Sequence, residues 1–325
     1  ESLPARQAVL HLTGPAVAAR LYAADPAPAF LPVTGTLAHL AFPPGVRADT
    51  GVRSGDRISP FYDPMIAKII ARGPSRAAAL QALETALTDT QVAGTVTNRA
   101  FLARLLAHSD VRAGRLDTGL IAREIAALTA AADPAPATLA AAALAALGLT
   151  GAPDPLAGVT LWTPLTRRVT LAAGETAWDV AVTTTGPRTR SIAAGGATLT
   201  ATHGAGGWRL DGQPLPATWT DGTAVEVFGP GAARFTVADP LDRARSAAGD
   251  PSRIAAPMPG LVKALFVTAG EQVAPGAPLA VLEAMKMEHT LTAAVAGTVA
   301  EVLVTEGAQV EAGAALVRLE PEDAA

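Results

Sequence analysis

The chain has 325 residues, a formal net charge of −4 and no cysteine. The length predicts two or three domains, and the charge gives no electrostatic reason to expect binding to nucleic acid or an anionic membrane. The lack of cysteine excludes disulfides, thiolate nucleophiles and cysteine-ligated metals, and it fits a reducing compartment. We therefore expect a cytoplasmic protein. The chain starts at Glu1 rather than at methionine, which indicates either processing or a place in a longer polypeptide.

Membrane and metal sites are not expected either. The longest apolar run, residues 139–149, is too short and too rich in alanine to cross a bilayer, and no early segment has the pattern of a signal peptide. The histidines are scattered, and none pairs with another at the spacing of metal ligands. They are His11, His39, His108, His203 and His289.

Residues 1–125 have a mixed α and β pattern. Ser75 is a predicted helix N-cap, because Leu80, Leu83 and Leu87 follow it at helical spacing. Asn98 is expected to cap a second helix. The buried stripe of that second helix is predicted to consist of Phe101, Leu102, Leu105 and Leu106.

Residues 126–157 form a predicted linker with a short alanine-rich helix. Residues 158–240 then alternate short apolar segments with glycine turns, which predicts a β-rich domain built as a closed antiparallel barrel or a sandwich. The expected strands lie over residues 168–171, 177–182, 197–202, 208–210, 217–219, 224–228 and 234–237. Residues 241–253 are polar and rich in turn formers, so we expect a flexible tether there.

Residues 254–321 contain one pattern twice, with a shift of 37 positions. Each copy predicts three strands separated by glycine turns, so the two copies form a pseudo-twofold β module. Its core is expected to pack Val262, Val267, Val273, Leu279 and Leu282 against Val299, Val304, Val310, Leu316 and Leu319. The segment between the copies, residues 284–288, is a predicted tight turn at the edge.

Lys286 lies in this turn and is one of only three lysines, with Lys68 and Lys263. Met285 and Met287 flank it. Methionine usually fills cores, so two methionines on an exposed tip favour a surface recognised by a modifying enzyme. One amine presented on such a tip indicates covalent attachment of a swinging group. The alternative is a solvated hairpin lysine between two half-buried methionines.

The segment Ala284-Met285-Lys286-Met287 resembles the biotinylation motif of biotin carboxyl carrier domains, and residues 256–260 resemble the segment that opens those domains. The resemblance implies a flattened β-barrel of the biotinyl/lipoyl type. It also implies that a biotin protein ligase recognises Glu283, Ala284, Met285 and Met287 and joins biotin by an amide to Lys286. Lipoyl domains share the fold but usually have Asp-Lys-Ala at this turn.

The front of the chain resembles the C-terminal third of the biotin carboxylase domain of an ATP-grasp enzyme. The motifs are residues 14–26, 30–35, 49–51, 60–68, 94–98 and 117–119. The resemblance places Arg20 beside biotin and bicarbonate, where a guanidinium stabilises an enolate or orients an anion. The alternative is that Arg20 only makes a structural ion pair. Tyr62, Asp63, Asn98 and Asp117 are interpreted as scaffold.

Some features of that family are missing. It commonly has histidine where this chain has Pro15 and glutamate where it has Ala18 and Ala24, so a reduced polar network around Arg20 is expected. The glycine-rich ATP lid, the ATP-binding lysines and the magnesium-binding carboxylates are not in this sequence. ATP, Mg²⁺ and bicarbonate are therefore assigned to an upstream site, and we expect that this chain alone does not activate bicarbonate.

The middle of the chain resembles, more weakly, the subunit-contact barrel of acyl-CoA carboxylase α subunits, with the methylcrotonyl-CoA carboxylase branch most similar. The motifs are Asp211-Gly212, Val227-Phe228-Gly229 and residues 238–241. In that family the barrel docks a carboxyltransferase β subunit within a hetero-oligomer. The chain is thus interpreted as the C-terminal portion of a biotin-dependent ligase subunit of leucine degradation. It would shuttle CO₂ as carboxybiotin on Lys286 to an acyl-CoA on the partner.

Other functions stay open at this point. The acyl-CoA could belong to a propionyl-, acetyl- or geranyl-CoA carboxylase. A non-catalytic adaptor could use the repeated module only to hold partners. A lipoyl carrier of a 2-oxo acid dehydrogenase is the third alternative, although such chains usually place the carrier near the N-terminus, whereas here it follows carboxylase-like sequence.

Overall fold

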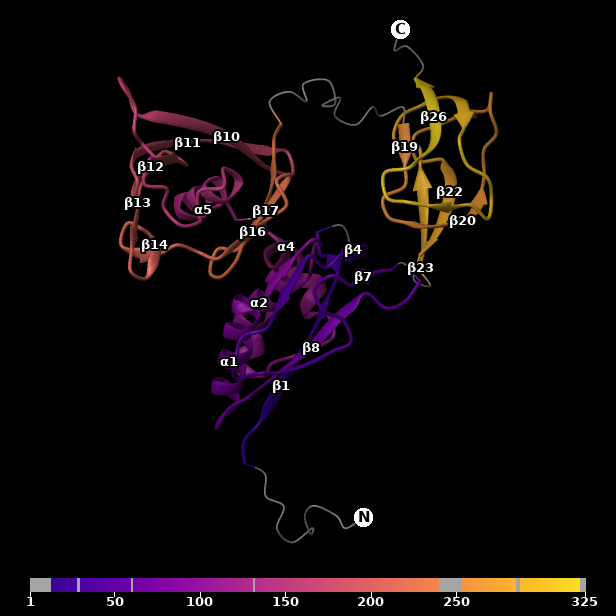
Figure 1. Cartoon of the computed structure of the whole chain (residues 1–325). Helices are drawn as coiled ribbons and strands as arrows, with labels where there is room; N and C mark the ends of the chain where they lie inside the picture. Colours follow the sequence, from indigo (N-terminus) through magenta and orange to yellow (C-terminus); the bar gives the residue numbers. More distant parts are fainter. Residues whose placement is uncertain are drawn as a thin grey trace.

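The computed structural model describes residues 13–27, 30–59, 61–130, 132–239, 253–284 and 287–321, and Figure 1 shows three bodies that follow one another along the chain. None of the described helices is long and apolar enough to cross a membrane.

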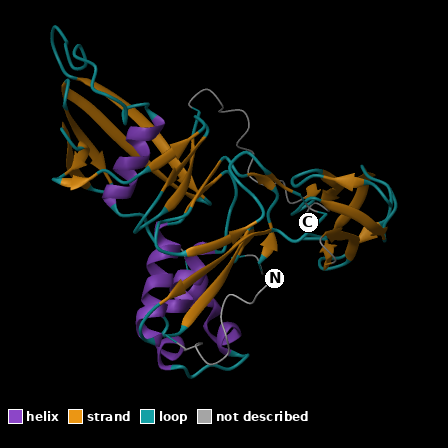
Figure 2. Ribbon diagram, turned by 60° about the horizontal axis from the view of Figure 1, so that its bottom comes forward, coloured by secondary structure: helices purple, strands orange, loops and turns teal. Residues whose placement is uncertain are grey.

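The first domain is a small α+β unit. Its main sheet has the strand order β1-β8-β6, with β1 at Ala16–Tyr22, β8 at Met65–Arg72 and β6 at Arg47–Thr50. Side chains alternate along β1, so that Ala19 and Leu21 are buried while Ala18 and Arg20 are exposed. The helices lie on one side of the strands in Figure 2, and they cover the buried face.

The remaining elements of this domain are short. The helices are α1 (Arg76–Asp89), α2 (Arg99–Ala107), α3 (Ser109–Ala113) and α4 (Leu120–Thr129). Three two-stranded ladders pair β2 (Ala24–Asp25) with β3 (Leu31–Pro32), β4 (Gly35–Thr36) with β7 (Arg57–Ile58), and β5 (His39–Ala41) with β9 (Gln91–Ala93).

The predicted cap of α1 is confirmed, and the predicted cap of α2 is wrong in its chemistry. Ser75 accepts a hydrogen bond from the backbone N–H of Ala78, and the three predicted leucines of α1 are buried. Asn98 does occupy the N-cap position of α2, but its side chain makes no capping bond there. That side chain instead binds the backbone of β1, because Asn98 is buried beside the strand.

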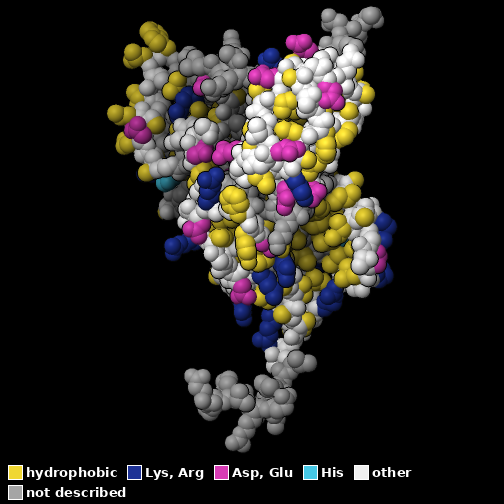
Figure 3. Space-filling model, turned by 90° about the vertical axis from the view of Figure 1, so that its right-hand side faces the viewer, with side chains coloured by type: hydrophobic (Ala, Val, Ile, Leu, Met, Phe, Trp, Pro, Cys, Tyr) yellow, Lys and Arg dark blue, Asp and Glu magenta, His cyan; other side chains and the backbone are white. Residues whose placement is uncertain are grey.

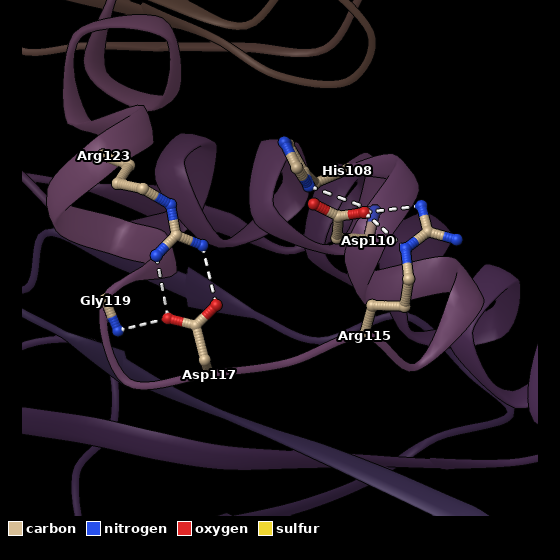
Figure 4. Close-up of polar contacts among 6 residues, drawn as sticks. All are labelled: His108, Asp110, Arg115, Asp117, Gly119 and Arg123. Atoms are coloured by element: carbon tan, nitrogen blue, oxygen red, sulfur yellow. Dashed lines mark hydrogen bonds and ion pairs between the residues drawn. The ribbon is translucent and has the colours of Figure 1, made fainter.

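Ion pairs fix the turn before α4, as Figure 4 shows. Asp117 accepts two bonds from the Arg123 guanidinium, at 2.9 and 2.7 Å, and a third from the backbone N–H of Gly119 at 2.7 Å. These donors, with Arg123 first, hold the pKa of Asp117 at about 2. The contacts of Asp117 are internal to the loop and the helix, which fits the interpretation of this residue as scaffold.

The central domain is one nine-stranded antiparallel sheet curled around a helix, α5 (Pro136–Ala146), as Figure 1 shows. The strand order is β15-β14-β13-β12-β11-β10-β18-β17-β16. The strands are β10 (Leu165–Ala173), β11 (Thr176–Gly186), β12 (Thr189–Ala194), β13 (Ala197–Gly204), β14 (Gly207–Leu210), β15 (Gln213–Pro214), β16 (Thr218–Thr220), β17 (Ala224–Val227) and β18 (Ala233–Val237). The expected barrel-like domain is thus confirmed, although its edge strands β15 and β16 do not pair with each other in the described ladders.

Helix α5 is the core of this domain rather than part of a linker. Residues 138–145 are buried on every side and pack against apolar residues of the curled sheet. Alanine supplies most of this surface, and its small side chain lets the strands pass close to the helix axis. The predicted linker region, residues 126–157, therefore contributes its helix to the β-rich domain.

One charged side chain lies inside the curled sheet. Arg190 of β12 is 3% exposed, and its Nε and Nη1 atoms have no hydrogen-bond partner among the described residues. Its guanidinium lies 4.0 Å from the centre of the Trp208 ring. Burial, and then the charge of Arg167, lower the pKa of Arg190. The ring face offsets part of the cost of burying this cation.

The third domain repeats its register as well as its sequence. One sheet has the order β19-β26-β24-β21 and the other β23-β22-β20-β25. The strands are β19 (Arg253–Ala255), β20 (Gly260–Leu265), β21 (Gln272–Val273), β22 (Pro278–Ala284), β23 (Met287–Thr292), β24 (Gly297–Val302), β25 (Gln309–Val310) and β26 (Ala315–Pro321). All ten predicted core residues lie in its core, with Val304 only partly buried.

The two copies in this domain are interlocked. The short strand β21 of the first copy pairs with β24 of the second, and β25 of the second pairs with β20 of the first. Each copy also has a bulge at the same place, between Val262 and Ala264 and between Val299 and Glu301. The repeat read from the sequence is therefore a repeat of backbone geometry.

The first and central domains meet around Glu226 of β17. Glu226 faces away from the core of its own sheet, yet it is only 9% exposed because residues of the first domain cover it. Arg234 Nε lies 3.6 Å from its Oε1 atom. Burial raises the pKa of Glu226 to about 7, although the charges of Arg234 and Arg99 act in the opposite direction.

The free energy of unfolding should depend on pH through Glu226. Its carboxyl group keeps a proton up to about pH 7 in the folded chain but only up to about pH 4.5 when unfolded, so the folded state binds more protons between these values. Stability from this group is present at low pH and is lost as pH rises through that window. We expect the stability of the wild type, relative to Glu226→Gln, to fall by about 3 kcal/mol between pH 4.5 and pH 8.

Denaturant unfolding followed by circular dichroism at each pH measures this difference. Glu175→Gln, in the exposed turn between β10 and β11, is the matched control and should leave the pH dependence unchanged. If the free energy of unfolding depended on pH in the same way for the wild type and Glu226→Gln, the raised pKa given to Glu226 would be contradicted.

Figure 3 shows one face of the molecule, on which hydrophobic, basic and acidic side chains are interspersed. This face has no extended patch of a single charge, in line with the net charge of −4.

Candidate functional site

The hairpin of β22 and β23 forms the end of the third domain at which the repeat joins. The two strands are paired residue by residue up to Glu283 with Glu288 and Ala284 with Met287. Only residues 285 and 286 connect them. Met285 and Lys286 lie outside the described residues, as does the side chain of Met287. The structure thus fixes both strand ends on either side of the predicted attachment lysine.

The end of β22 is held from behind by β20. Leu261 pairs with Glu283, and Gly260 lies so close that a Cβ atom there would be 2.8 Å from the Glu283 carbonyl oxygen. Only glycine fits at that distance. Ala284 is buried beside it, whereas the Glu283 and Glu288 side chains reach solvent. One side of the hairpin is therefore closely packed, and its acidic side is accessible.

Lys263 is a site residue that the sequence reasoning missed. It lies on β20 at the bulge, and its ammonium group contacts the carboxylates of both Glu283 and Glu288. The signal in the sequence was its scarcity. It is the only lysine of the repeated module besides Lys286, and the second copy has Ala300 at the matching position.

Arg20 lies on the exposed face of β1, away from the core. Its strand partner is Lys68 on β8, and Lys68 in turn is opposite Asp49 on β6, so three charged residues form a row across the sheet. The Asp49 carboxylate is engaged with Arg47, whose hydrogen bond at 2.8 Å is the main cause that lowers the pKa of Asp49. No described side chain forms an ion pair or a hydrogen bond with the Arg20 guanidinium.

Asn98 fixes the backbone on both sides of Leu21, directly after Arg20. Its Oδ1 atom accepts from the Tyr22 N–H at 2.9 Å, and its Nδ2 group donates to the Arg20 carbonyl at 3.3 Å. One buried amide thus sets the position of the strand residue that presents the guanidinium, which supports the interpretation of Asn98 as scaffold.

The three departures from the family motif all remove polar groups near this strand. Ala18 is exposed on the same face as Arg20, Ala24 is buried, and the Pro15 carbonyl accepts from the Gly73 N–H at 3.2 Å. As a consequence β1 provides no carboxylate next to Arg20. The free guanidinium is thus available to an anion from outside the described residues.

The structure does not bring Arg20 and the hairpin together. They lie in different domains, and no described hydrogen bond or ion pair connects them. The described histidines are also separate: His39 binds Gln91 at 2.8 Å, His108 accepts from the Asp110 N–H (Figure 4), His203 lies against Trp208 and His289 lies on β23 opposite Leu282. No group of three or more histidine, aspartate or glutamate side chains in the described part of the chain could hold a metal.

Comparison with known proteins gives the two outer domains a family. Residues 18–123 match the family model of the biotin carboxylase C-terminal domain, and residues 252–319 match the model described as biotin-requiring enzyme. The chain contains a biotin carboxylase C-terminal domain and a biotinyl domain. The second match indicates covalent biotin, and the flattened β-barrel described above is the expected fold.

Two curated relatives match most of the chain, and a solved structure matches part of it. The mitochondrial methylcrotonoyl-CoA carboxylase subunit alpha of Dictyostelium discoideum is 30% identical over 91% of this chain and 47% of its own length. The same subunit of Rattus norvegicus is 31% identical over 90% of this chain and 45% of its own length. The biotin carboxylase domain of Hydrogenobacter thermophilus 2-oxoglutarate carboxylase is 27% identical over 41% of this chain and 30% of that chain, with a TM-score of 0.38. The chain spans about half the length of these two curated relatives.

Asn98→Ala should destabilise the carboxylase domain. The substitution leaves the Tyr22 N–H and the Arg20 carbonyl without their partner in a mostly buried place, so we expect the free energy of unfolding to fall by about 2–3 kcal/mol. Asn98→Asp keeps the acceptor for the Tyr22 N–H and removes only the donor to the Arg20 carbonyl. The fall in its free energy of unfolding should therefore differ from that of Asn98→Ala, and it reports on that one hydrogen bond. Denaturant unfolding measures both variants, and wild-type stability for Asn98→Ala would contradict the role given to this amide.

Proposed function

We propose that this chain is the biotin-carrying portion of an acyl-CoA carboxylase α subunit, with biotin joined by an amide to Lys286. The observation that carries the proposal is the hairpin of the biotinyl domain. Its strands stay paired up to Ala284 and Met287, and Lys286 is one of the two residues that connect them. A short connection between paired strand ends suits an amine that a ligase must reach and that must then enter other active sites.

The residues around the hairpin fit this cofactor. Gly260 and the buried Ala284 hold the strand end, and Glu283 with Glu288 keeps that end polar and accessible. A biotin protein ligase would recognise Glu283, Ala284, Met285 and Met287. When bound, biotin supplies a ureido nitrogen that can accept and release a carboxyl group. The protein supplies a short rigid mount and delivery of that nitrogen to two places.

Arg20 is proposed to act in the carboxylase half. Its exposed guanidinium lacks a partner among the described residues, and Asn98 fixes the strand that presents it. A planar cation held in this way can bind an oxyanion by two parallel hydrogen bonds. The match to a biotin carboxylase is to its C-terminal domain, over residues 18–123. We assign ATP, Mg²⁺ and the activation of bicarbonate to the rest of such an enzyme. The proposal therefore assigns the activation of bicarbonate to residues outside this chain.

We assign the acyl-CoA as methylcrotonoyl-CoA, which would place the complex in leucine degradation. The support is that relatives named for this substrate are similar across nine-tenths of the chain. The propionyl-CoA carboxylase alpha chain of Ruegeria pomeroyi is 37% identical but covers only 38% of this chain. A cytoplasmic location, expected from the lack of cysteine, is part of the proposal, whereas the names of the two longer matches say mitochondrial.

An exposed apolar loop of the central domain is the proposed contact with the carboxyltransferase β subunit. The loop runs from α5 to β10, and Leu161 and Trp162 in it are 91% and 92% exposed. Leu156 and Val159 of the same loop are exposed as well, as is Leu165 at the start of β10. The base of the loop is anchored, because the Trp208 indole donates to the Gly151 carbonyl at 2.8 Å. Exposed aromatic and aliphatic side chains on an anchored loop are typical of interface anchors.

Lys286→Arg should abolish biotin attachment while the domain stays folded, because arginine keeps the charge but cannot form the amide under ligase catalysis. We expect one biotin per wild-type chain after coexpression with a biotin protein ligase, measured by intact mass, and none on Lys286→Arg. Lys68→Arg, in the carboxylase domain, is the matched control and should still receive one biotin. An unmodified wild type, or a wild type that gains lipoate, would contradict the proposal.

Trp162→Ala together with Leu161→Ala should weaken binding to the carboxyltransferase β subunit. Both side chains are solvated in the free chain, so their removal should leave the folded domain intact and remove anchor contacts on binding. We expect at least a tenfold rise in Kd, about 1.4 kcal/mol or more, by calorimetry with the purified partner. Leu303→Ala, an exposed leucine of the biotinyl domain, should leave Kd unchanged. Equal affinity of the double variant and the wild type would place the interface elsewhere.

A further inference from the structure

Three charged side chains meet beside the end of the β22–β23 hairpin. Lys263 Nζ hydrogen-bonds the Glu288 carboxylate and lies 3.7 Å from Glu283 Oε2. Glu283 and Glu288 are themselves directly opposite each other in the strand register. We name Lys263, Glu283 and Glu288 the hairpin clamp. All three side chains keep access to solvent, so the clamp lies on the surface of the domain.

The two glutamates alone would oppose pairing of the strands. Like charges on directly opposite residues of an antiparallel pair are destabilising, because their side chains are only a few ångströms apart. The pair lies one step from Ala284 and Met287, the last paired residues before the connection. Repulsion at this step acts where the hairpin has the fewest further contacts to hold it closed. A cation between the two carboxylates turns the repulsion into attraction.

The bulge of β20 is what puts the cation there. Val262 pairs with Leu282 and Ala264 with Val281, so Lys263 is the extra residue and has no partner of its own on β22. An extra residue of this kind redirects its side chain relative to the regular alternation of the strand. Here the redirected side chain reaches across β22 to the glutamate on β23. The bulge thus serves a three-strand contact that a regular strand would not make.

The second copy of the repeat serves as an internal comparison. It has the same bulge, between Val299 and Glu301, and it has Glu320 where the first copy has Glu283. The bulged residue there is Ala300. The strand beside β26 is β19, which has the place that β23 has beside β22 but precedes β20 in the chain instead of forming a hairpin with β26. The lysine is therefore present in the copy whose third strand continues into the hairpin, and the bulge by itself does not require it.

We propose that Lys263 is a positioning residue for modification of the biotinyl domain. By holding Glu283 and Glu288 together, it keeps the hairpin paired to its last residues and so presents Lys286 to the ligase in one geometry. This inference rests on the proposed function, since it concerns the same lysine. The inference adds Lys263, a residue outside the biotinylation motif, and it gives the bulge of β20 a role in placing that residue.

The clamp also favours the charged form of Lys263, the second lysine of the domain. The hydrogen bond to Glu288, and then the charges of Glu288 and Glu283, raise the pKa of Lys263. An amine acylated by an activated biotin must first lose its proton, and Lys263 loses it less readily than a free lysine. Lys263 is thus held as a charged ammonium by two carboxylates, and in that form it is a poorer nucleophile.

The rate of biotin transfer by a purified biotin protein ligase to the unmodified chain tests the proposal. We expect Lys263→Met to lower kcat/KM about fivefold, which matches the scale of one cross-strand charge pair, and Lys263→Arg to stay within about twofold of the wild type. Glu288→Gln in the Lys263→Met background removes the repulsion and should restore most of the rate. Arg318→Met removes one positive charge from β26, in the other sheet, and is the matched control.

A second measurement separates this inference from the proposed function. Hydrogen exchange of the backbone amides of residues 282–284 and 287–289 reports pairing of the hairpin end without any biotin. We expect faster exchange there in Lys263→Met and wild-type exchange in the double variant. Wild-type rates of both exchange and transfer in Lys263→Met would overturn the role of the clamp, as would a double variant no better than Lys263→Met. An unmodified wild type with the expected exchange changes would instead contradict only the proposed function.

Discussion

Backbone pairing between β22 and β23 is the constraint on which the proposed function depends. A cofactor arm can move between two sites only if its mount does not deform, and here the mount is a strand pair that ends two residues apart. The pairing is supported from one side by β20, where Gly260 permits a contact too close for any other residue. It is supported on the other side by charge, through Lys263 and its two glutamates. Sterics thus fix the buried side of the hairpin, and electrostatics fix the exposed side.

The carboxylase domain uses a different principle for Arg20. No ion pair with a described residue restrains the guanidinium, and order comes from the backbone instead, through a single buried amide of Asn98. The central domain shows the opposite case, since Arg190 is buried over Trp208 with two nitrogens unpartnered within the described structure. The two arginines differ in solvent exposure. The exposed one is free to bind an anion, and the buried one is stabilised by an aromatic face.

Much of this architecture could be predicted from the sequence, because strong patterns determine it. The 37-residue repeat gave the core of the biotinyl domain, and the spacing of Leu80, Leu83 and Leu87 gave the buried face of α1. Helix α5 was assigned to a linker since it is apolar all around and so has no periodicity to reveal a packed face. The strand β12 was missed for a related reason, as its buried Arg190 breaks the apolar alternation that identifies strands.

Site residues were harder to predict than elements, because they depend on contacts between distant segments. Asn98 looked like a helix cap, and its true partners on β1 lie 76 and 78 positions away. Lys263 was noted only as a rare residue, since its role requires the bulge that turns it toward β23. Lys286 itself was found from the motif and the repeat, and it lies outside the described residues. Its role as the attachment point stays a prediction.

The exchange of short strands between the two copies of the biotinyl domain has a consequence for its completeness as a unit. Each copy leaves a gap in its own sheet that only the other copy fills, through β21 on β24 and β25 on β20. A single copy is therefore complete only beside a second one. The two copies therefore complete each other as one unit. The segment that joins them occurs once in this pseudo-symmetric module, and it is the segment that contains Lys286.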